Sequence, residues 1–218
     1  MTTETLTAAA FKSAVTIVAH PDDEVLWAGG TLLQYLRGKR QVFTLCRAHD
    51  SDRAPRFHKV LQELEAGGAM ADLDDGPEQQ PLPEALVSET ILSLLQGQHF
   101  DVMLTHHPNG EYTRHRRHEE IGRSVIKLWH AGRIYADELW VFAYEDGGRA
   151  YYPVANRHAN IFYELPEAVW QKKYALITGQ YGFSPDSWEA RTTPAAEAFW
   201  RFTDKHVALA WLYDKPGI

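Results

Sequence analysis

Apolar runs alternate with amphipathic segments along the first two thirds of the chain. Runs with the length and composition of buried strands lie at residues 13–19, 41–48, 70–73, 102–105 and 139–144. Between them, apolar residues recur at helical spacing at residues 26–39, 55–66, 84–95 and 118–130. Strands that alternate with helices favour right-handed crossovers and a mainly parallel sheet. The pattern therefore predicts an α/β fold.

The last third of the chain has a less regular pattern. It predicts a strand at residues 161–165 and helices at 167–177 and 194–202. No internal repeat, low-complexity tract or linker interrupts the chain. With 218 residues, of which 44% are hydrophobic, the chain is long enough for one sizeable core and short for two. We therefore expect a single domain over residues 1–218.

Composition and charge narrow the functional classes. A net charge of −7 disfavours nucleic-acid binding, and no apolar run approaches the roughly 20 residues that span a bilayer. Residues 1–10 lack a basic segment and contain Glu4, so they do not resemble a signal peptide. The single cysteine, Cys46, excludes an intramolecular disulfide. We expect a cytoplasmic protein with a small-molecule partner, and the sequence leaves the oligomeric state open.

Two clusters of polar residues follow predicted strands. The run His20-Pro21-Asp22-Asp23-Glu24 comes directly after the first strand, and His115-Arg116-Arg117-His118-Glu119-Glu120 comes after the loop that follows the strand at 102–105. Such a concentration of charge beside a core strand is costly unless something compensates it, and a divalent cation is the simplest compensation. Ligands of open α/β sheets bind beyond the carboxyl ends of the strands. The two clusters should therefore meet at one edge of the sheet.

The residue types in these clusters suit a catalytic metal. His20, Asp23 and one histidine of the second cluster would supply three nitrogen and oxygen ligands and leave a position for water. His118, at a predicted helix start, is favoured, and His106 and His107 are competitors. Zinc is the expected ion, one per chain, although this set also suits Fe²⁺. The metal would activate water and polarise a carbonyl group.

Asp22 lies beside the expected ligands without being needed as one. A general base that takes a proton from water must occupy such a position. The alternative is that Asp22, Asp23 and Glu24 only cap the following helix, whose amino end favours negative charge. Capping explains one carboxylate well and three poorly.

The sequence Ala-His-Pro-Asp-Asp-Glu at residues 19–24, followed by Gly29-Gly30, resembles the signature of the PIG-L/LmbE-like N-acetylglucosaminyl deacetylases. Residues 115–118 are similar to the second motif of that family, His-Pro-Asp-His. Residues 110–112 and Gly122 support this alignment, and the segments around Arg56 and Glu197 resemble further family features. The resemblance implies a Rossmann-like three-layer sandwich and a zinc-dependent hydrolase that removes an acetyl or other acyl group from the amide nitrogen of an amino sugar or related small molecule.

The same resemblance implies roles for five residues. His20, Asp23 and His118 would hold the metal, Asp22 would be the general base, and His115 would be an oxyanion stabiliser or acid. The chain departs from the family pattern where Arg116 and Arg117 replace Pro-Asp, so His115 lacks the usual carboxylate. Glu119, Glu120 or a more distant acid could replace it.

Arginines near both clusters bear on the substrate. They are Arg47, Arg53, Arg114, Arg116, Arg117 and Arg123. Guanidinium groups at a site favour a substrate with a phosphate or carboxylate. The alternative is a solvated face in which these arginines pair with Glu119 and Glu120.

Two other functional classes compete with a deacetylase. One is a catalytically inactive metal-binding or sugar-binding protein on the same fold, for which Asp22 would be unnecessary. The other is a nucleotide-binding enzyme, but no Gly-x-Gly-x-x-Gly follows the first strand, and the carboxylates there would repel a pyrophosphate.

Overall fold

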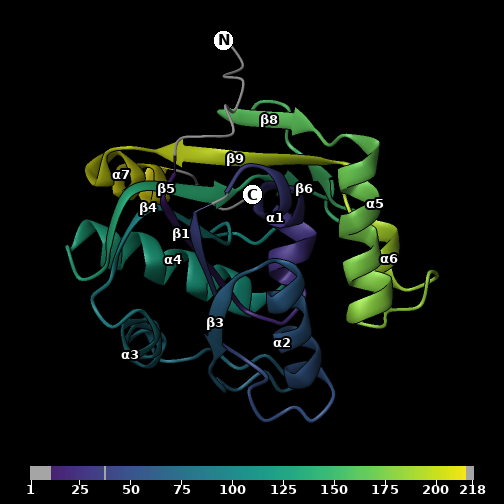
Figure 1. Cartoon of the computed structure of the whole chain (residues 1–218). Coiled ribbons are helices and arrows are strands. Elements are labelled where there is room, and N and C mark those ends of the chain that lie inside the picture. Colours follow the sequence, from purple (N-terminus) through teal and green to yellow (C-terminus); the bar gives the residue numbers. More distant parts are fainter. Residues whose placement is uncertain (1–10, 37, 215–218) are drawn as a thin grey trace.

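A seven-stranded sheet, with strand order β3-β2-β1-β4-β5-β9-β8, forms the centre of the molecule (Figure 1). A computed structural model describes residues 11–36 and 38–214. The strands of the sheet are β1 (Ser13–Val18), β2 (Lys39–Thr44), β3 (Gly67–Met70), β4 (His99–Thr105), β5 (Tyr135–Phe142), β8 (Ile161–Glu164) and β9 (Ala196–Phe202). Strands β1 to β5 pair in parallel, whereas β9 runs antiparallel to both β5 and β8. The short strands β6 (Tyr144–Glu145) and β7 (Val154–Ala155) form a separate pair.

Helices cover both faces of the sheet. They are α1 (Asp23–Gln34), α2 (Arg53–Glu63), α3 (Glu84–Leu95), α4 (Arg116–His130), α5 (Glu167–Ala175), the π-helix η1 (Leu176–Gln180), α6 (Trp188–Thr192) and α7 (Lys205–Asp214). α1, α2 and the α5–η1 segment share one hydrophobic cluster with the sheet, and α3, α4 and α7 share the other. The predicted mainly parallel α/β sandwich of three layers is therefore confirmed. Among the described residues, no helix has the length and apolar character needed to cross a membrane.

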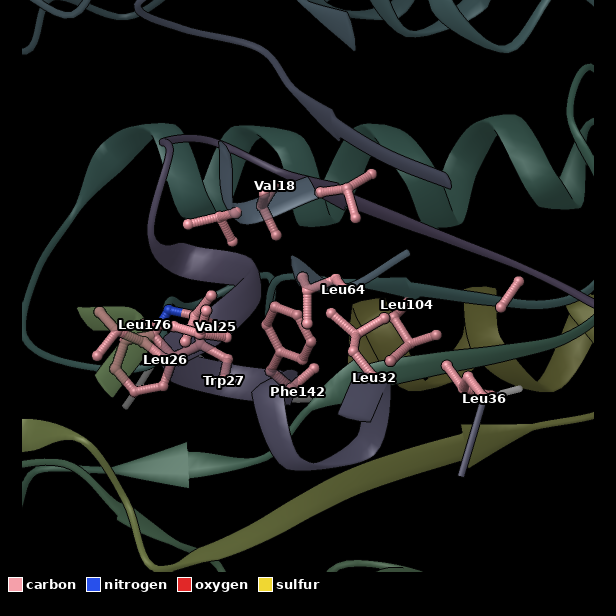
Figure 2. Close-up of a cluster of buried hydrophobic side chains, with 14 of the residues drawn as sticks. Val18, Val25, Leu26, Trp27, Leu32, Leu36, Leu64, Leu104, Phe142 and Leu176 are labelled. Atoms are coloured by element: carbon pink, nitrogen blue, oxygen red, sulfur yellow. The ribbon is translucent and has the colours of Figure 1, made fainter. Parts of the chain in front are cut away.

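Side-chain alternation along β1 divides the core between the two layers. Ala14 and Val18 belong to the cluster beneath α1 and α2, and Val15 and Ile17 belong to the cluster beneath α3 and α4. Figure 2 shows the first cluster, in which Trp27 of α1 packs with Phe142 of β5. Both faces of β1 are buried, which explains why this strand reads as a continuous apolar run.

Several element boundaries differ from those predicted. α1 begins at Asp23 rather than at residue 26 and ends at Gln34, and Lys39 belongs to β2. Gly67 and Gly68 are part of β3, although the sequence placed the third strand at residues 70–73. Residues 1–10, for which we predicted the absence of a signal peptide, and residue 37 lie outside the described parts of the chain.

The predicted helix at residues 194–202 is wrong. Residues 196–202 form β9, which lies between β5 and β8 and pairs with both. Alanine and glutamate at its start favour a helix, but local propensity is a weak preference that tertiary context overrides. Here, two neighbouring strands offer backbone partners along the segment.

Candidate metal centre

Both polar clusters lie at the carboxyl edge of the sheet, as predicted. β1 and β4 are neighbours, with Ile17 paired to Thr105 near their carboxyl ends. The chain turns from β1 directly into α1, whereas a loop at residues 106–115 leads from β4 into α4. Residues nearly a hundred positions apart in sequence therefore meet at this edge.

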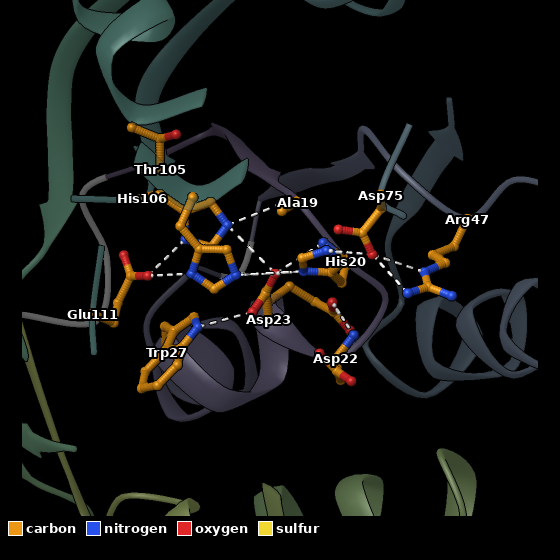
Figure 3. A network of polar contacts seen from close by, with 12 residues as sticks. Ala19, His20, Asp22, Asp23, Trp27, Arg47, Asp75, Thr105, His106 and Glu111 are labelled. Atoms are coloured by element: carbon orange, nitrogen blue, oxygen red, sulfur yellow. Dashed lines mark hydrogen bonds and ion pairs between the residues drawn. The ribbon is translucent and has the colours of Figure 1, made fainter. Parts of the chain in front are cut away.

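Three side chains point one potential ligand atom each at a common point. Nδ1 of His20 lies 3.1 Å from Oδ2 of Asp23 (Figure 3). Nε2 of His118 lies 3.3 Å from that oxygen and 3.4 Å from Nδ1 of His20. Ligands that bind zinc tetrahedrally at about 2.0–2.1 Å lie about 3.3 Å from one another. The separations of these three atoms fit a single cation.

Further carboxylates orient the two histidine rings. Glu111 Oε2 lies 2.6 Å from Nδ1 of His118, and Asp75 Oδ2 lies 3.2 Å from Nε2 of His20. Figure 3 shows Asp75 between His20 and Arg47. Carboxylates of this kind select the histidine tautomer that leaves the other nitrogen free for a metal. Burial raises the pKa of Glu111, but the neighbouring histidines outweigh it and hold the pKa below its ordinary value.

Sequence reasoning missed both of these carboxylates. Asp75 lies in a segment that the sequence predicts only as a polar loop. Glu111 was used only to support the alignment of residues 115–118 with the second family motif. The indole nitrogen of Trp27 also donates a hydrogen bond of 3.0 Å to Oδ1 of Asp23, one turn earlier on α1. Residues four apart on a helix lie on the same face, so the contact of Trp27 with Asp23 could have been predicted from the sequence.

His106, a predicted competitor for the third ligand position, also lies beside the ligand atoms. Asp23, His106 and His118 form a second group close enough together to hold a metal ion, with His106 in the place of His20. However, Nε2 of His106 accepts the backbone N–H of Ala19 at 2.9 Å, and its Nδ1 lies 3.0 Å from Glu111. Both ring nitrogens of His106 are therefore engaged within the protein, and its ring stacks on that of His118 at 3.9 Å. His106 supports His118 rather than replacing it.

Asp22 lines a pocket of about 230 Å³ beside these ligand atoms. The pocket is formed by His20, Pro21, Asp22, Asp23, Leu26, Arg47, Arg53, Asp75, Tyr112, His115, Trp188 and Glu189. Burial and the charge of Asp23 raise the pKa of Asp22 well above its ordinary value. A carboxyl group with a raised pKa in a cleft has the properties of a group that exchanges protons.

His115 also lines the pocket, with its ring 4.6 Å from those of His20 and His118. Burial and these two rings lower the pKa of His115 to about 3, so its imidazole is neutral at physiological pH. Among the described residues, its Nδ1 has no hydrogen-bond partner.

The expected support of His115 by a neighbouring glutamate is not observed. Glu119 pairs with Arg114 and Arg123, and Glu120 pairs with Arg117. Both carboxylates therefore neutralise arginines instead of orienting the imidazole.

The arginines of the second cluster do not line the pocket. Arg117 is fully buried and donates to the carbonyls of Asp74 and Gln80, so it anchors the loop that contains Asp75. Arg114, Arg116 and Arg123 are also not among the lining residues. None of these four arginines lines the pocket, although Arg114 and Arg116 flank His115, which does. Arg47 and Arg53 do line the pocket.

An aromatic wall borders the pocket. Tyr112 and Trp188 have ring centroids 4.7 Å apart, and Trp188, at 37% exposure, lies at the rim. Trp188 begins α6, a short helix in the part of the chain where the sequence pattern is least regular. No local signal in the sequence connected it to the two motifs.

Comparisons with known proteins show a shared fold. No family model matches the chain, and no curated protein matches it in sequence. Among solved structures, it is similar to an N,N'-diacetylchitobiose deacetylase from Pyrococcus horikoshii, with a TM-score of 0.67 and 16% identity over 94% of this chain and 87% of that one.

Two further similar structures are also deacetylases by name. The deacetylase of the A40926 pseudoaglycone has a TM-score of 0.56 and 18% identity over 78% of this chain and 81% of that one. A deacetylase of teicoplanin biosynthesis has a TM-score of 0.53 and 13% identity over 78% of this chain and 84% of that one. The chain thus has the fold of LmbE/PIG-L-type deacetylases, the fold that its two motifs imply.

Proposed function

We propose that this protein is a zinc-dependent hydrolase that removes an acetyl or other acyl group from the amide nitrogen of an amino sugar or related small molecule. The observation that carries the proposal is the convergence of ligand atoms from His20, Asp23 and His118 beside the carboxyl group of Asp22. The similar solved structures are all named as deacetylases, and this supports amide hydrolysis as the reaction.

The donor set fits a catalytic zinc site. Two imidazole nitrogens and one carboxylate oxygen are typical ligands of zinc that keeps a position open for water, and Fe²⁺ also accepts them. When bound, the ion would lower the pKa of water and polarise the amide carbonyl. Asp75 and Glu111 would hold the rings of His20 and His118 with the correct nitrogens facing the ion.

The remaining pocket residues have separable roles in this proposal. Asp22 accepts a proton from the attacking water and passes it to the leaving amine, as a general base and then an acid. His115, with a neutral imidazole, offers an N–H to the negative charge that develops on the amide oxygen. The rings of Tyr112 and Trp188 provide an apolar surface on which a sugar ring packs.

The pocket charges favour an uncharged substrate. Arg47 lies 2.6 Å from Asp75, and Arg53 lies 3.1 Å from Asp22. Because each arginine is already paired with a carboxylate, an anionic substrate group would have to displace an internal partner. We therefore propose a neutral N-acyl amino sugar. The single cysteine, Cys46, is free and buried, which fits the reducing cytoplasm in which we place the enzyme.

Metal analysis tests the ligand assignment. The purified protein should contain about one zinc per chain, and Asp23→Ala and His118→Ala should each lose most of it. His107→Ala is the matched control, because Nδ1 of His107 accepts the N–H of Asn109 and is not aimed at the three ligand atoms. Unchanged zinc in both ligand variants would refute the assignment.

Turnover tests the role of Asp22. We expect acetate release from N-acetylglucosamine or N,N'-diacetylchitobiose, and Asp22→Asn should keep its zinc while kcat falls roughly 10²–10⁴-fold. Asp137→Asn is the control, because Asp137 is exposed at the start of β5 and pairs with His99. A near-normal kcat for Asp22→Asn would contradict this role.

A further inference from the structure

Glu24 is the one carboxylate of the first motif that neither the metal site nor the pocket uses. It is fully buried on α1 and is not among the pocket-lining residues. Its Oε1 accepts a 2.5 Å hydrogen bond from the hydroxyl of Tyr181, and its Oε2 accepts the backbone N–H of Asp22 at 3.1 Å. Glu24 therefore connects the backbone of Asp22 to a residue far along the chain.

Tyr181 begins a three-residue segment, Tyr181-Gly182-Phe183, that follows the π-helix η1. The N–H of Tyr181 donates to the carbonyl of Leu176 at 2.9 Å, and the N–H of Phe183 donates to that of Ile177 at 3.2 Å. π-Helical turns are rare and occur often at functional sites. In this protein, the π-helix η1 contacts both α1 and α2.

The path of this segment is closely constrained by α2. Nη1 of Arg56 donates to the carbonyl of Tyr181 at 2.8 Å. Gly182 has a φ of +74°, and a Cβ atom there would lie 1.9 Å from the same Nη1. Only glycine combines this conformation with this close approach.

Phe183 reaches the other side of Asp22. The guanidinium of Arg53 lies over the ring of Phe183, 4.3 Å from its centroid, and donates to Oδ2 of Asp22 at 3.1 Å. This cation–π contact limits the positions that Arg53 adopts. The carboxyl group of Asp22 is thus connected to Phe183 through Arg53, as its backbone is connected to Tyr181 through Glu24.

Asp22 needs such support because its backbone conformation is unfavourable. Its φ is +120°, a value that residues other than glycine rarely adopt. Strained conformations persist only where the surroundings impose them. The hydrogen bond from the N–H of Asp22 to Glu24 is one such constraint.

We infer that residues 181–183 position Asp22 for catalysis, through Glu24 on the backbone side and through Arg53 on the carboxyl side. Tyr181, Glu24 and Phe183 are positioning residues in this arrangement. The inference rests on the proposed function, because it assumes that Asp22 exchanges a proton with the substrate or water.

Tyr181→Phe tests the backbone side by removing one hydroxyl group. We expect kcat to fall roughly 10-fold to 100-fold while KM and zinc content stay at the parent values, because a small displacement of a catalytic group slows the reaction without weakening substrate binding. Tyr163→Phe is the matched control: Tyr163 also donates its hydroxyl to a buried carboxylate, that of Glu197, outside the pocket.

Glu24 provides a rescue experiment. Glu24→Ala should lose kcat as Tyr181→Phe does, whereas Glu24→Gln should recover most of that loss, because an amide can accept from Asp22 N–H and donate to the oxygen of Tyr181. A merely structural role would lower the unfolding midpoint of Tyr181→Phe and Tyr163→Phe alike and leave kcat per zinc unchanged. That result would overturn the inference.

A measurement without substrate separates this inference from the proposed function. In zinc-loaded, ¹³C-Asp-labelled protein, Asp22→Asn identifies the carboxyl resonance of Asp22. Tyr181→Phe should shift that resonance, and Tyr163→Phe should leave it in place. If no substrate is hydrolysed but the resonance shifts, the proposed function fails and the positioning of Asp22 stands. An unshifted resonance in Tyr181→Phe refutes the positioning, whatever the activity and whether or not Glu24→Ala folds.

Discussion

Glu197→Gln should lower the free energy of unfolding by several kcal/mol, although the side chains of glutamate and glutamine have nearly the same shape. The buried carboxylate of Glu197 accepts five hydrogen bonds. Oε1 accepts from the N–H of Gly30 at 2.7 Å and from Nζ of Lys173 at 2.8 Å. Oε2 accepts from the N–H and hydroxyl of Thr31 at 2.8 and 2.6 Å and from the hydroxyl of Tyr163 at 3.0 Å. In either orientation, a glutamine places its NH₂ group against a backbone N–H.

The magnitude follows from the groups left without partners. Lys173 is fully buried, and apart from Glu197 its ammonium contacts only the carbonyl of Pro194, at 3.3 Å, among the hydrogen bonds of the described residues. Breaking a buried ion pair costs about 3–5 kcal/mol, and an orphaned backbone N–H costs about 1–3 kcal/mol. Because Lys173 can lose its proton, its pKa being lowered by burial, these costs do not simply add. We expect a loss of about 4 kcal/mol, a large part of a typical total of about 5–15 kcal/mol.

Removing the other partner should cost less. Lys173→Met leaves the carboxylate of Glu197 with four donors, two of them backbone N–H groups. A carboxylate that keeps such donors remains well stabilised, so we expect a loss of about 2 kcal/mol.

Urea unfolding, followed by circular dichroism, measures both losses through the shift of the midpoint at an unchanged m value. Glu164→Gln is the control, because Glu164 is exposed at the end of β8 and should change stability by less than about 0.5 kcal/mol. If Glu197→Gln costs less than about 1 kcal/mol, or no more than Lys173→Met, the reasoning from donor geometry is wrong.

Three further predictions concern the fold around the site. Gly68→Ala would place its Cβ 2.1 Å from the carbonyl oxygen of Val42, so its thermal midpoint should fall further than that of Gly97→Ala, which has a φ of +71° but open space around it. Equal midpoints would contradict the close approach of β2 and β3. Burial raises the pKa of the Cys46 thiol, so iodoacetamide at pH 8 should modify it only in unfolded protein, and rapid reaction of the native protein would refute its burial. Arg117→Met should speed amide hydrogen exchange in residues 74–80 while the strands stay protected, because Arg117 bonds two carbonyls of that loop. Unchanged exchange there would show that other contacts hold the loop.

The order of strands and helices in the first two thirds of the chain was predictable. β1 is a nearly continuous buried run, β2, β4 and β5 each end in buried residues, and α2 and α4 carry one apolar face, whereas β3 lacks an apolar run and was displaced from its predicted position. Both signals are local, because burial on one or two faces dictates the residue pattern directly. The parallel pairing followed from the alternation of the two element types.

The last third was less predictable because its elements depend on distant partners. The Ala-Glu-Ala start of β9 has helical propensity, and the segment becomes a strand between β5 and β8. The π-helix η1 and the short helix α6 also have no clear local signal. The π-helix η1 contacts α1 and α2, which lie far away in the sequence, and α6 contacts η1, so both depend on packing between remote segments.

The sequence by itself determined which residue types meet at the edge of the sheet. His20, Asp22, Asp23 and His118 follow strands or begin helices, and strand order brings such positions together. Only the tertiary structure decided how each of them is used. In the folded chain, both ring nitrogens of His106 form hydrogen bonds within the protein, and Arg117 donates to a loop carbonyl instead of lining the pocket. Asp75, from a distant loop, lies beside the ring of His20. These outcomes depend on distances and orientations between segments that are remote in sequence, and local residue patterns carry no information about them.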